Sequence, residues 1–178
     1  MPRILFCRVR EVRVPSRANE GDAGLDFYIP TNLTVEDLKK CNPNLKLLHI
    51  GLSNRDGYIE TITVYPQERI LIPSGIRVLI TPKESMLMAA NKSGISTKYG
   101  LVFSAEIVDS PYVGEVHIGI INTGYQPVTL TRNQKVVQFI HVPIYNTTPE
   151  EIRLNYYEKI AKDWGTRGTD GFGSKDNE

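Results

Sequence analysis

Short runs of residues that favour β-strands recur along most of this chain, and Gly, Pro and Asn separate one run from the next. Several runs alternate apolar with polar residues or are rich in Val and Ile, which is typical of an all-β sandwich or barrel. In chain order the runs are ILFCRVREV (4–12), LDFYI (25–29), YIETITVY (58–65), RILIPSGIRVLI (69–80), SMLMAA (85–90), LVFSAEIVD (101–109), EVHIGIIN (115–122), PVTLT (127–131) and VVQFIHVPIY (136–145).

Two segments favour helices. In TVEDLKKCN (34–42), Thr34 can cap a helix, with Asp37 three residues on. The segment EEIRLNYYEKIAKDW (150–164) follows Pro149, and its hydrophobic period is ambiguous. Residues 31–57 are polar and rich in turn residues, which indicates a loop insertion rather than a second domain. Because the chain has 178 residues and no internal repeat, we expect one domain over residues 1–178.

Charge and cysteine usage narrow the classes of partner and compartment. A net charge of +1 gives no global electrostatic support for a nucleic-acid or membrane partner. Cys7 and Cys41 are too few for a disulfide framework, and no stretch approaches the ~18 apolar residues of a membrane span, so we expect a cytoplasmic protein. His49, His117 and His141 are dispersed, without the spacing of metal ligands.

The tail sequence RGTDGFGS (167–174) combines three glycines with an arginine and an aromatic ring. Glycines at this density disfavour a helix or a strand. Arg167 can bind phosphate through two parallel hydrogen bonds, and Phe172 is a flat apolar ring with no core nearby in sequence. One interpretation is a mobile arm at about residues 163–178 that orders on a ligand carrying phosphates and a flat ring. The alternative is a frayed tail.

Two stretches in the first hundred residues place polar side chains beside strands. In EGDAGLDFYIP (20–30), Asp26 can point a carboxylate into a cleft or merely bond its own backbone. In NKSGISTKYGL (91–101), Lys92, Ser93 and Gly94 present a cation, a hydroxyl and a closely approachable backbone, as a phosphate cradle requires. A polar turn explains the same residues.

Two later stretches add further candidates. AEIVDSPYVGEV (105–116) places Asp109 at the end of a strand, where it can deprotonate a water or cap a turn. Tyr112, three residues later and before Gly114, can pack against a sugar. In RNQKVVQFIHVPI (132–144), Lys135 and Gln138 begin an apolar strand, and Gln138 has the chemistry to bind a phosphate oxygen or a backbone amide.

In this order, and together with the tail, the stretches resemble the five motifs of the homotrimeric dUTP nucleotidohydrolases, the dUTPase family. The resemblance spans roughly residues 3–30 and 58–174 and leaves residues 31–57 outside. It implies a distorted, jelly-roll-like β-barrel with a C-terminal arm that crosses to another subunit, so that a homotrimer shares its active sites. The motif residues are Ala23 to Phe27, Lys92 to Ile95, Glu106 to Gly114, Lys135 with Gln138, and Arg167 to Ser174.

The resemblance also implies the reaction and the role of each matching residue. The activity is hydrolysis of dUTP to dUMP and pyrophosphate with Mg²⁺. Asp109 activates the water, Asp26 holds waters of the Mg²⁺ ion, and the ring of Tyr112 excludes a ribose 2′-hydroxyl. The residues implied in contacts with the phosphates or the base are Lys92, Ser93, Gly94, Lys135, Gln138, Arg167, Phe172, Gly173 and Ser174.

Three departures from the family pattern keep other interpretations open. Lys92 and Lys135 stand where the family usually has arginine, so the guanidinium fork is lost. Glu106 stands where the family usually has glycine in the hairpin that reads the base, which leaves dCTP or a 5-modified dUTP as an alternative substrate.

Two other classes of function remain as alternatives. The related dCTP deaminases carry a catalytic glutamate in the strand after this hairpin, but here Gly119 lies near that position and Glu115 comes too early. A protein that acts mainly through a regulator bound by residues 31–57, or a catalytically dead binder, is the alternative from outside the enzymes.

Overall fold

The computed structural model describes residues 1–164, apart from the side chain of Leu47. The tail residues Arg167, Phe172, Gly173 and Ser174 therefore lie outside the described residues. The chain divides into two units, Met1–Tyr145 and Asn146–Glu178, and each is described here by itself.

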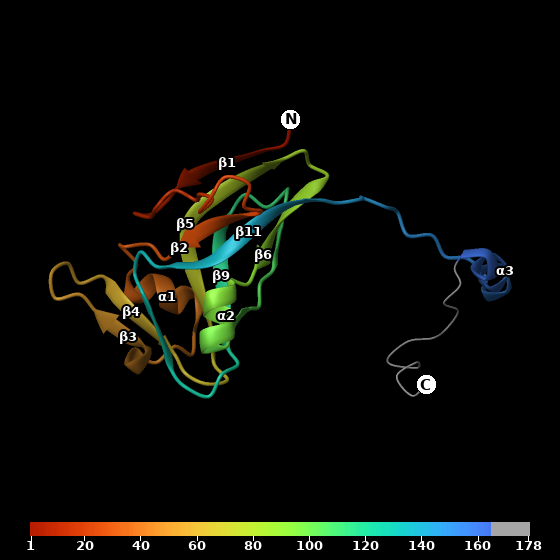
Figure 1. Ribbon diagram of the computed structural model, residues 1–178. Coiled ribbons are helices and arrows are strands. Elements are labelled where there is room, and N and C mark those ends of the chain that lie inside the picture. Colours follow the sequence, from red (N-terminus) through yellow and green to blue (C-terminus); the bar gives the residue numbers. More distant parts are fainter. Residues whose placement is uncertain (165–178) are drawn as a thin grey trace. The chain divides into compact units, whose positions relative to one another are not determined.

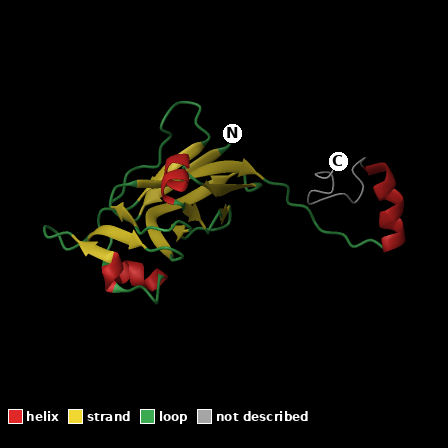
Figure 2. Ribbon diagram, turned by 60° about the horizontal axis from the view of Figure 1, so that its bottom comes forward, coloured by secondary structure: helices red, strands yellow, loops and turns green. Residues whose placement is uncertain are grey.

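Three antiparallel sheets make up the first unit, so the expected all-β class is confirmed (Figures 1 and 2). The first sheet has the order β1-β5-β9-β7, formed by Arg3–Arg8, Arg69–Thr81, Glu115–Asn122 and Leu101–Phe103. The second has the order β10-β4-β3, formed by Val128–Thr131, Ile59–Val64 and Ile50–Leu52. The third has the order β2-β11-β6-β8, formed by Gly24–Tyr28, Lys135–Pro143, Ser85–Ala90 and Ile107–Asp109.

The core lies between these sheets and is built by the alternation of side chains along the strands. In β6, residues 85, 87 and 89 are buried and the residues between them are partly exposed. The central strand β5 is buried over most of its length, as expected for a strand covered on both faces. Phe27 of β2 and Phe139 of β11 are each 1% exposed, and their ring centroids are 4.7 Å apart. Strands β2 and β11 are therefore fixed together by their apolar side chains as well as by their backbones.

Residues 31–57 are packed into this core. The segment contains α1 (Val35–Cys41), the 3₁₀-turn η1 (Leu47–His49) and β3, which pairs with β4. Thr34 and Asp37 form the expected capping box. Leu33 and Leu38 are fully buried, and the amide of Asn42 bonds both main-chain groups of Leu71 in β5 at 2.8 Å.

A helix that the sequence did not predict follows β6. The expectation of two helical segments was wrong, because α2 (Ser93–Tyr99) also forms. Its residues include a glycine and two β-branched side chains, which lower helix propensity. The helix ends at Gly100, whose φ of +68° favours glycine, and the Gly100 N–H caps the Ser96 carbonyl.

The second unit contains α3 (Leu154–Trp164), so the helical interpretation of this segment is confirmed. None of its residues is buried. No helix within residues 1–164 has both the length and the apolar content needed to span a membrane.

We predict that Asp37→Asn lowers the free energy of unfolding by about 1 kcal/mol at pH 7, because the carboxylate accepts charge-assisted hydrogen bonds. Its Oδ2 atom lies 3.1 Å from the Thr34 N–H, 2.7 Å from the Thr34 hydroxyl and 3.0 Å from Arg10 Nη1. Burial acts to raise the pKa of Asp37, but the hydrogen bonds of Thr34 and the charge of Arg10 outweigh burial and lower it.

Because the folded-state pKa is lowered, this stabilisation is present above the unfolded pKa of about 4 and is lost as the pH falls through the folded value. Urea unfolding of both proteins between pH 7 and pH 2.5 measures the difference. We expect it to shrink toward zero at the acid end. A difference that stays constant with pH would contradict the assignment.

Candidate active site

The carboxylate of Asp26 is buried between two lysines. Asp26 lies in β2 and is 3% exposed. The Lys92 ammonium donates to its Oδ1 atom, and the Lys135 ammonium donates to its Oδ2 atom at 3.0 Å. A buried carboxylate needs such partners, because desolvation of an unpaired charge is costly. We call Asp26, Lys92 and Lys135 the lysine–aspartate cluster.

The order of strands in the third sheet explains how the cluster forms. Strand β11 lies between β2 and β6 (Figure 1), and its residue Gln138 pairs with Asp26 on one side and Ala90 on the other. Lys135 begins β11, and Lys92 follows the end of β6. Residues from three separate motifs are thereby brought to one end of one sheet.

Gln138 closes the same end of the sheet. Its side chain crosses Gly24, where a Cβ atom would lie 2.6 Å from the Gln138 Oε1 atom. Its Nε2 atom donates to the main-chain oxygen of Asn91 at 3.2 Å. The glycine of the first motif is therefore required by the glutamine of the fourth.

The cluster carries an excess of positive charge. Burial acts to raise the pKa of the Asp26 carboxyl, but the hydrogen bonds and charges of Lys92 and Lys135 outweigh burial and lower it. The hydrogen bond and the charge of Asp26 raise the pKa of Lys135. Two ammonium groups thus face one carboxylate, and the remaining positive charge suits an anionic ligand.

Ser93 and Gly94 begin α2 directly after Lys92, and both are exposed. A Cβ atom added at Gly94 would meet nothing within 4 Å, so packing among the described residues does not demand glycine there. The backbone at Gly94 is open to close approach by a ligand.

Asp109 and Tyr112 lie on the turn that joins β8 to β9, which we call the β8–β9 turn. The two strands belong to different sheets, so the hairpin expected from the sequence does not form here. Asp109 ends β8 and is exposed, and its main-chain oxygen accepts from the Tyr112 N–H at 3.0 Å. The Tyr112 hydroxyl donates to the main-chain oxygen of Glu115 at 2.8 Å. A Cβ atom at Gly114 would lie 2.5 Å from the Tyr112 hydroxyl, so only glycine lets the ring fold back over the strand.

One copy of the chain does not bring Asp109 to the lysine–aspartate cluster. Asp109 pairs with Met86, whereas Gln138 pairs with Ala90 at the other end of β6. Four residues of strand cover about 13 Å, and the three strand spacings between Asp26 and Asp109 cover about 14 Å. The two backbones are therefore separated by roughly 20 Å within one chain.

The structure also shows the surroundings of Glu106 and Gly119, the two positions that bear on another substrate and on deamination. Glu106 is exposed, and its main-chain oxygen accepts from the Ala89 N–H at 2.6 Å. At Gly119 a Cβ atom would lie 2.6 Å from Ser104 Oγ and 3.2 Å from the Ala105 backbone nitrogen. A glutamate at residue 119 would therefore have to displace Ser104 and Ala105, which disfavours the deaminase arrangement here.

Asp26 is the only carboxylate in the lysine–aspartate cluster. Within residues 1–164 no group of three or more His, Cys, Asp and Glu side chains could hold a metal ion. A single carboxylate fits an Mg²⁺ ion that arrives on phosphate oxygens and keeps its waters, rather than one held by a protein cage.

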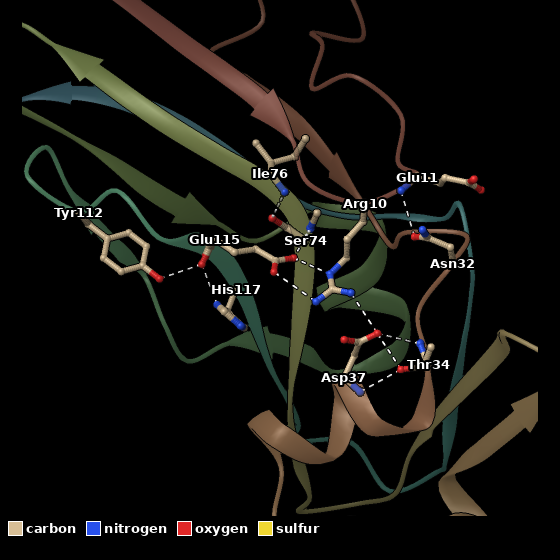
Figure 3. Close-up of polar contacts among 11 residues, drawn as sticks. Arg10, Glu11, Asn32, Thr34, Asp37, Ser74, Ile76, Tyr112, Glu115 and His117 are labelled. Carbon is tan, nitrogen blue, oxygen red and sulfur yellow. Dashed lines mark hydrogen bonds and ion pairs between the residues drawn. The ribbon is translucent and has the colours of Figure 1, made fainter.

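The sequence did not predict one polar network next to the β8–β9 turn, formed by Arg10 and Glu115. The carboxylate of Glu115 binds the guanidinium of Arg10 at 2.9 Å, although 105 residues separate the two (Figure 3). The available signal was a glutamate directly after Gly114, but nothing in the sequence identified its partner.

We predict that Lys92→Met destabilises the fold more than Lys135→Met. The Lys92 side chain is 19% exposed and that of Lys135 is 47% exposed, so Asp26 depends more on Lys92. We expect losses of about 2–4 kcal/mol for Lys92→Met and at most about 1 kcal/mol for Lys135→Met in urea unfolding. Adding Asp26→Asn to Lys92→Met should recover part of the loss. Equal effects of the two single variants would contradict this ranking.

Comparison with known proteins agrees with the geometry. The dUTPase family model matches residues 58–175. The deoxyuridine 5′-triphosphate nucleotidohydrolase of Chromobacterium violaceum is 27% identical over 174 residues, covering 97% of this chain and 93% of that protein. That of a Wolbachia from Brugia malayi is 31% identical over 116 residues, covering 64% and 70%.

Solved structures show the same fold. A Staphylococcus bacteriophage 80alpha dUTPase mutant, solved with dUpNHpp, superposes with a TM-score of 0.68 at 21% identity, covering 97% of each chain. The EIAV dUTPase gives a TM-score of 0.60 at 18% identity, covering 86% of this chain and 98% of that one. With the family model matching well over half of its residues, this chain belongs to the dUTPase family.

Proposed function

We propose that this protein hydrolyses dUTP to dUMP and pyrophosphate. The observation that carries the proposal is the lysine–aspartate cluster, where Lys92 and Lys135 meet beside the exposed Ser93. Relatives that match nearly the whole chain are named for this activity, and a structural neighbour was solved with the nucleotide analogue dUpNHpp.

The triphosphate is proposed to bind at the cationic end of the third sheet. Lys92 and Lys135 offset its charge, Ser93 contacts the phosphates beside the scissile bond, and the open backbone at Gly94 allows close approach. Gln138 lies at the same end and supplies an amide. From the tail, Arg167 is assigned to the γ-phosphate and Phe172 to the base, with Gly173 and Ser174 completing that motif.

Asp109 is proposed as the general base. Its exposed carboxylate orients a water and takes its proton as the water oxygen attacks the α-phosphorus. The bond between the α-phosphorus and the α,β-bridging oxygen breaks, and pyrophosphate leaves. The step needs no covalent intermediate, so neither Cys7 nor Cys41 takes part.

Tyr112 is proposed as the platform for the sugar. Its hydroxyl bonds the Glu115 main-chain oxygen and Gly114 lets the ring lie close to the strand, so the ring has a defined position. A ring held there leaves no room for a ribose 2′-hydroxyl and favours deoxyribose.

An Mg²⁺ ion bound to the triphosphate would reduce its negative charge, and Asp26 is the carboxylate proposed to hold the ion through its waters. A structure of phage phi11 dUTPase is described as showing the coordination of a structural Mg(II) ion. In this chain Asp26 also orients the ammonium groups of Lys92 and Lys135.

The working enzyme is proposed to be a homotrimer with shared sites. Asp109 and the lysine–aspartate cluster are separated by roughly 20 Å of backbone in one chain. This is too far for the general base Asp109 and the lysines of the same copy to act on one α-phosphate. A second copy supplies the missing half, and the tail of residues 163–178 is proposed to come from a third.

Two alternatives to dUTP hydrolysis as the main role remain: another nucleotide substrate, selected by Glu106, and binding of a protein regulator by residues 31–57. The exposed side chain of Glu106 is available to a substrate with an amino or 5-substituent, such as dCTP or a 5-modified dUTP. Residues 31–57 are the surface proposed for a protein regulator, as the alternative to a purely enzymatic role. Phage dUTPases, which are among the structural neighbours, are described as controlling the transfer of virulence genes.

The proposed function predicts which nucleotides are cleaved and how much the rate depends on Asp109 as general base. With Mg²⁺ present, pyrophosphate release should be fast from dUTP and at least about 100-fold slower from dCTP, dTTP and UTP. Asp109→Asn should reduce the dUTP rate by at least about 1000-fold without changing the free energy of unfolding, because the side chain is exposed. Preference for dCTP would assign Glu106 a role in base choice and overturn the dUTP proposal.

A mixture of two inactive variants tests whether two copies of the chain share each site. Asp109→Asn and Ser93→Ala variants, each nearly inactive alone, are unfolded together and refolded as a mixture. If each site takes Asp109 from one copy and Ser93 from another, mixed assemblies contain intact sites and activity returns. The matched control is each variant refolded alone at the same total concentration. No recovery in the mixture would mean that one copy supplies both residues.

A further inference from the structure

Arg10 ties the segment after β1 to two distant elements of the first unit. Its Nε atom donates to Glu115 Oε1 at 2.9 Å and its Nη2 atom to Glu115 Oε2 at 3.3 Å, a two-point contact with the first residue of β9. Its Nη1 atom lies 3.0 Å from Asp37 Oδ2 in α1. The guanidinium is therefore held from both sides, as Figure 3 shows.

The ion pairs of Arg10 are largely shielded from water. The side chains of Arg10, Glu115 and Asp37 are 20%, 15% and 20% exposed. Burial acts to lower the pKa of Arg10, but the hydrogen bond and charge of Glu115 and the charge of Asp37 outweigh it and raise the pKa. Salt screens such half-buried ion pairs less than it screens surface pairs. The ion pairs of Arg10 can therefore hold the side chain of Glu115 in place.

Glu115 connects this ion pair to the β8–β9 turn, which carries Tyr112. Its carboxylate accepts from the Gly75 N–H at 2.7 Å, in addition to Arg10. Its main-chain oxygen accepts from the Tyr112 hydroxyl and from His117 Nδ1, each at 2.8 Å (Figure 3). The atom that holds the Tyr112 ring thus belongs to the residue that Arg10 holds by its side chain.

Gly75 of β5 provides a further contact that holds the Glu115 carboxylate. Its φ of +74° favours glycine, and a Cβ atom added there would lie 3.0 Å from the Arg10 Cβ, so another residue would be strained and would push against Arg10. Its carbonyl accepts from the Val9 N–H at 2.8 Å, so both its main-chain groups are fixed. The carboxylate of Glu115 cannot shift without breaking contacts with β5 and with the segment after β1.

The rest of the β8–β9 turn is largely exposed and makes few other hydrogen bonds among the described residues. Ile107, Tyr112 and Val113 are 60%, 44% and 63% exposed. The Ser110 hydroxyl donates to the Lys83 carbonyl at 2.7 Å, and the Tyr112 N–H closes the turn on Asp109, but both contacts precede the tyrosine ring. Within residues 1–164, the Glu115 main-chain oxygen is the one hydrogen-bond partner of the Tyr112 hydroxyl.

We propose that Arg10 and Glu115 are a positioning pair that fixes the Tyr112 ring and thereby sets discrimination between deoxyribose and ribose. The contact between Tyr112 and the sugar rests on the proposed function. The position of the Tyr112 ring rests on its hydrogen bond to Glu115. Neither residue touches the nucleotide. Their contribution is to hold the Glu115 main-chain oxygen where the Tyr112 hydroxyl reaches it.

The test compares Glu115→Gln and Arg10→Ala with a matched control, Arg132→Ala. Arg132 also bridges two carboxylates, with contacts of 2.8 Å to Asp56 and 2.7 Å to Glu60, and its side chain is 21% exposed. It therefore matches Arg10 in the exposure of its side chain and in the number of ion pairs, but neither of its ion pairs involves the β8–β9 turn or Glu115. Arg10→Lys is a milder variant, which keeps the charge and loses the fork.

The kinetic readout is the ratio of kcat/KM for dUTP to kcat/KM for UTP. We expect the Glu115 and Arg10 variants to lower this ratio by roughly tenfold, mainly by raising KM for dUTP, because a ring displaced by a fraction of an ångström fits the sugar less well. Arg10→Lys should fall between them and the wild type. A ratio unchanged in these variants, or lowered equally by Arg132→Ala, overturns the proposal.

A second readout does not depend on turnover. The ¹³C-labelled ring signal of Tyr112, assigned by its disappearance in Tyr112→Phe, should shift or broaden in the Glu115 and Arg10 variants without nucleotide. It should stay in place in Arg132→Ala. A signal unmoved by Glu115→Gln and Arg10→Ala refutes the positioning role. If the ring signal moves but the wild type does not cleave dUTP, the proposed function fails and the positioning pair stands.

Discussion

The buried carboxylate of Asp26 is the constraint on which the candidate site depends. A charge that is 3% exposed is tolerated only with close partners of opposite sign, and the third sheet supplies two of them. Pairing of β11 with β2 places Lys135 at one oxygen, and the turn after β6 places Lys92 at the other. A shift of β11 by one residue would reverse the faces of its side chains and leave Asp26 unpaired.

The two halves of the candidate site are stabilised in different ways. The lysine–aspartate cluster is buried and ionic, so its geometry is fixed by the cost of exposing unpaired charge. The β8–β9 turn with Asp109 and Tyr112 is exposed and short, and the Tyr112 ring is held by the Glu115 main-chain oxygen at the start of β9. The proposed phosphate site would therefore use charge that is already in place, whereas the proposed sugar contact would depend on a surface turn held through Glu115.

The fold class was predictable because each strand signals itself locally. Alternation in SMLMAA appears directly as alternating burial of β6, and Thr34 with Asp37 marked the start of α1. Helix α2 was missed because Gly94, Ile95 and Thr97 lower its propensity, and its stability comes from the surrounding structure. The same stretch was correctly singled out for its chemistry, since Lys92 lies in the cluster.

The contacts between motifs could not be predicted in the same way. The sequence placed Asp26, Lys92 and Lys135 in separate motifs and assigned each to the phosphates or their metal, but not to one another. Their pairing depends on strand register, which links residues 66 and 109 positions apart. The bond between Arg10 and Glu115 has the same origin, because only the fold brings β9 to the segment after β1.

The packing of residues 31–57 has a consequence for how such a chain can change over evolutionary time. An added surface loop can be lost again by a single deletion, because nothing else relies on it. Here Leu33 and Leu38 are fully buried and Asn42 satisfies both main-chain groups of Leu71. Excision would open a hole in the interior and strip β5 of two hydrogen bonds, so the segment can be inherited or remodelled but not simply discarded.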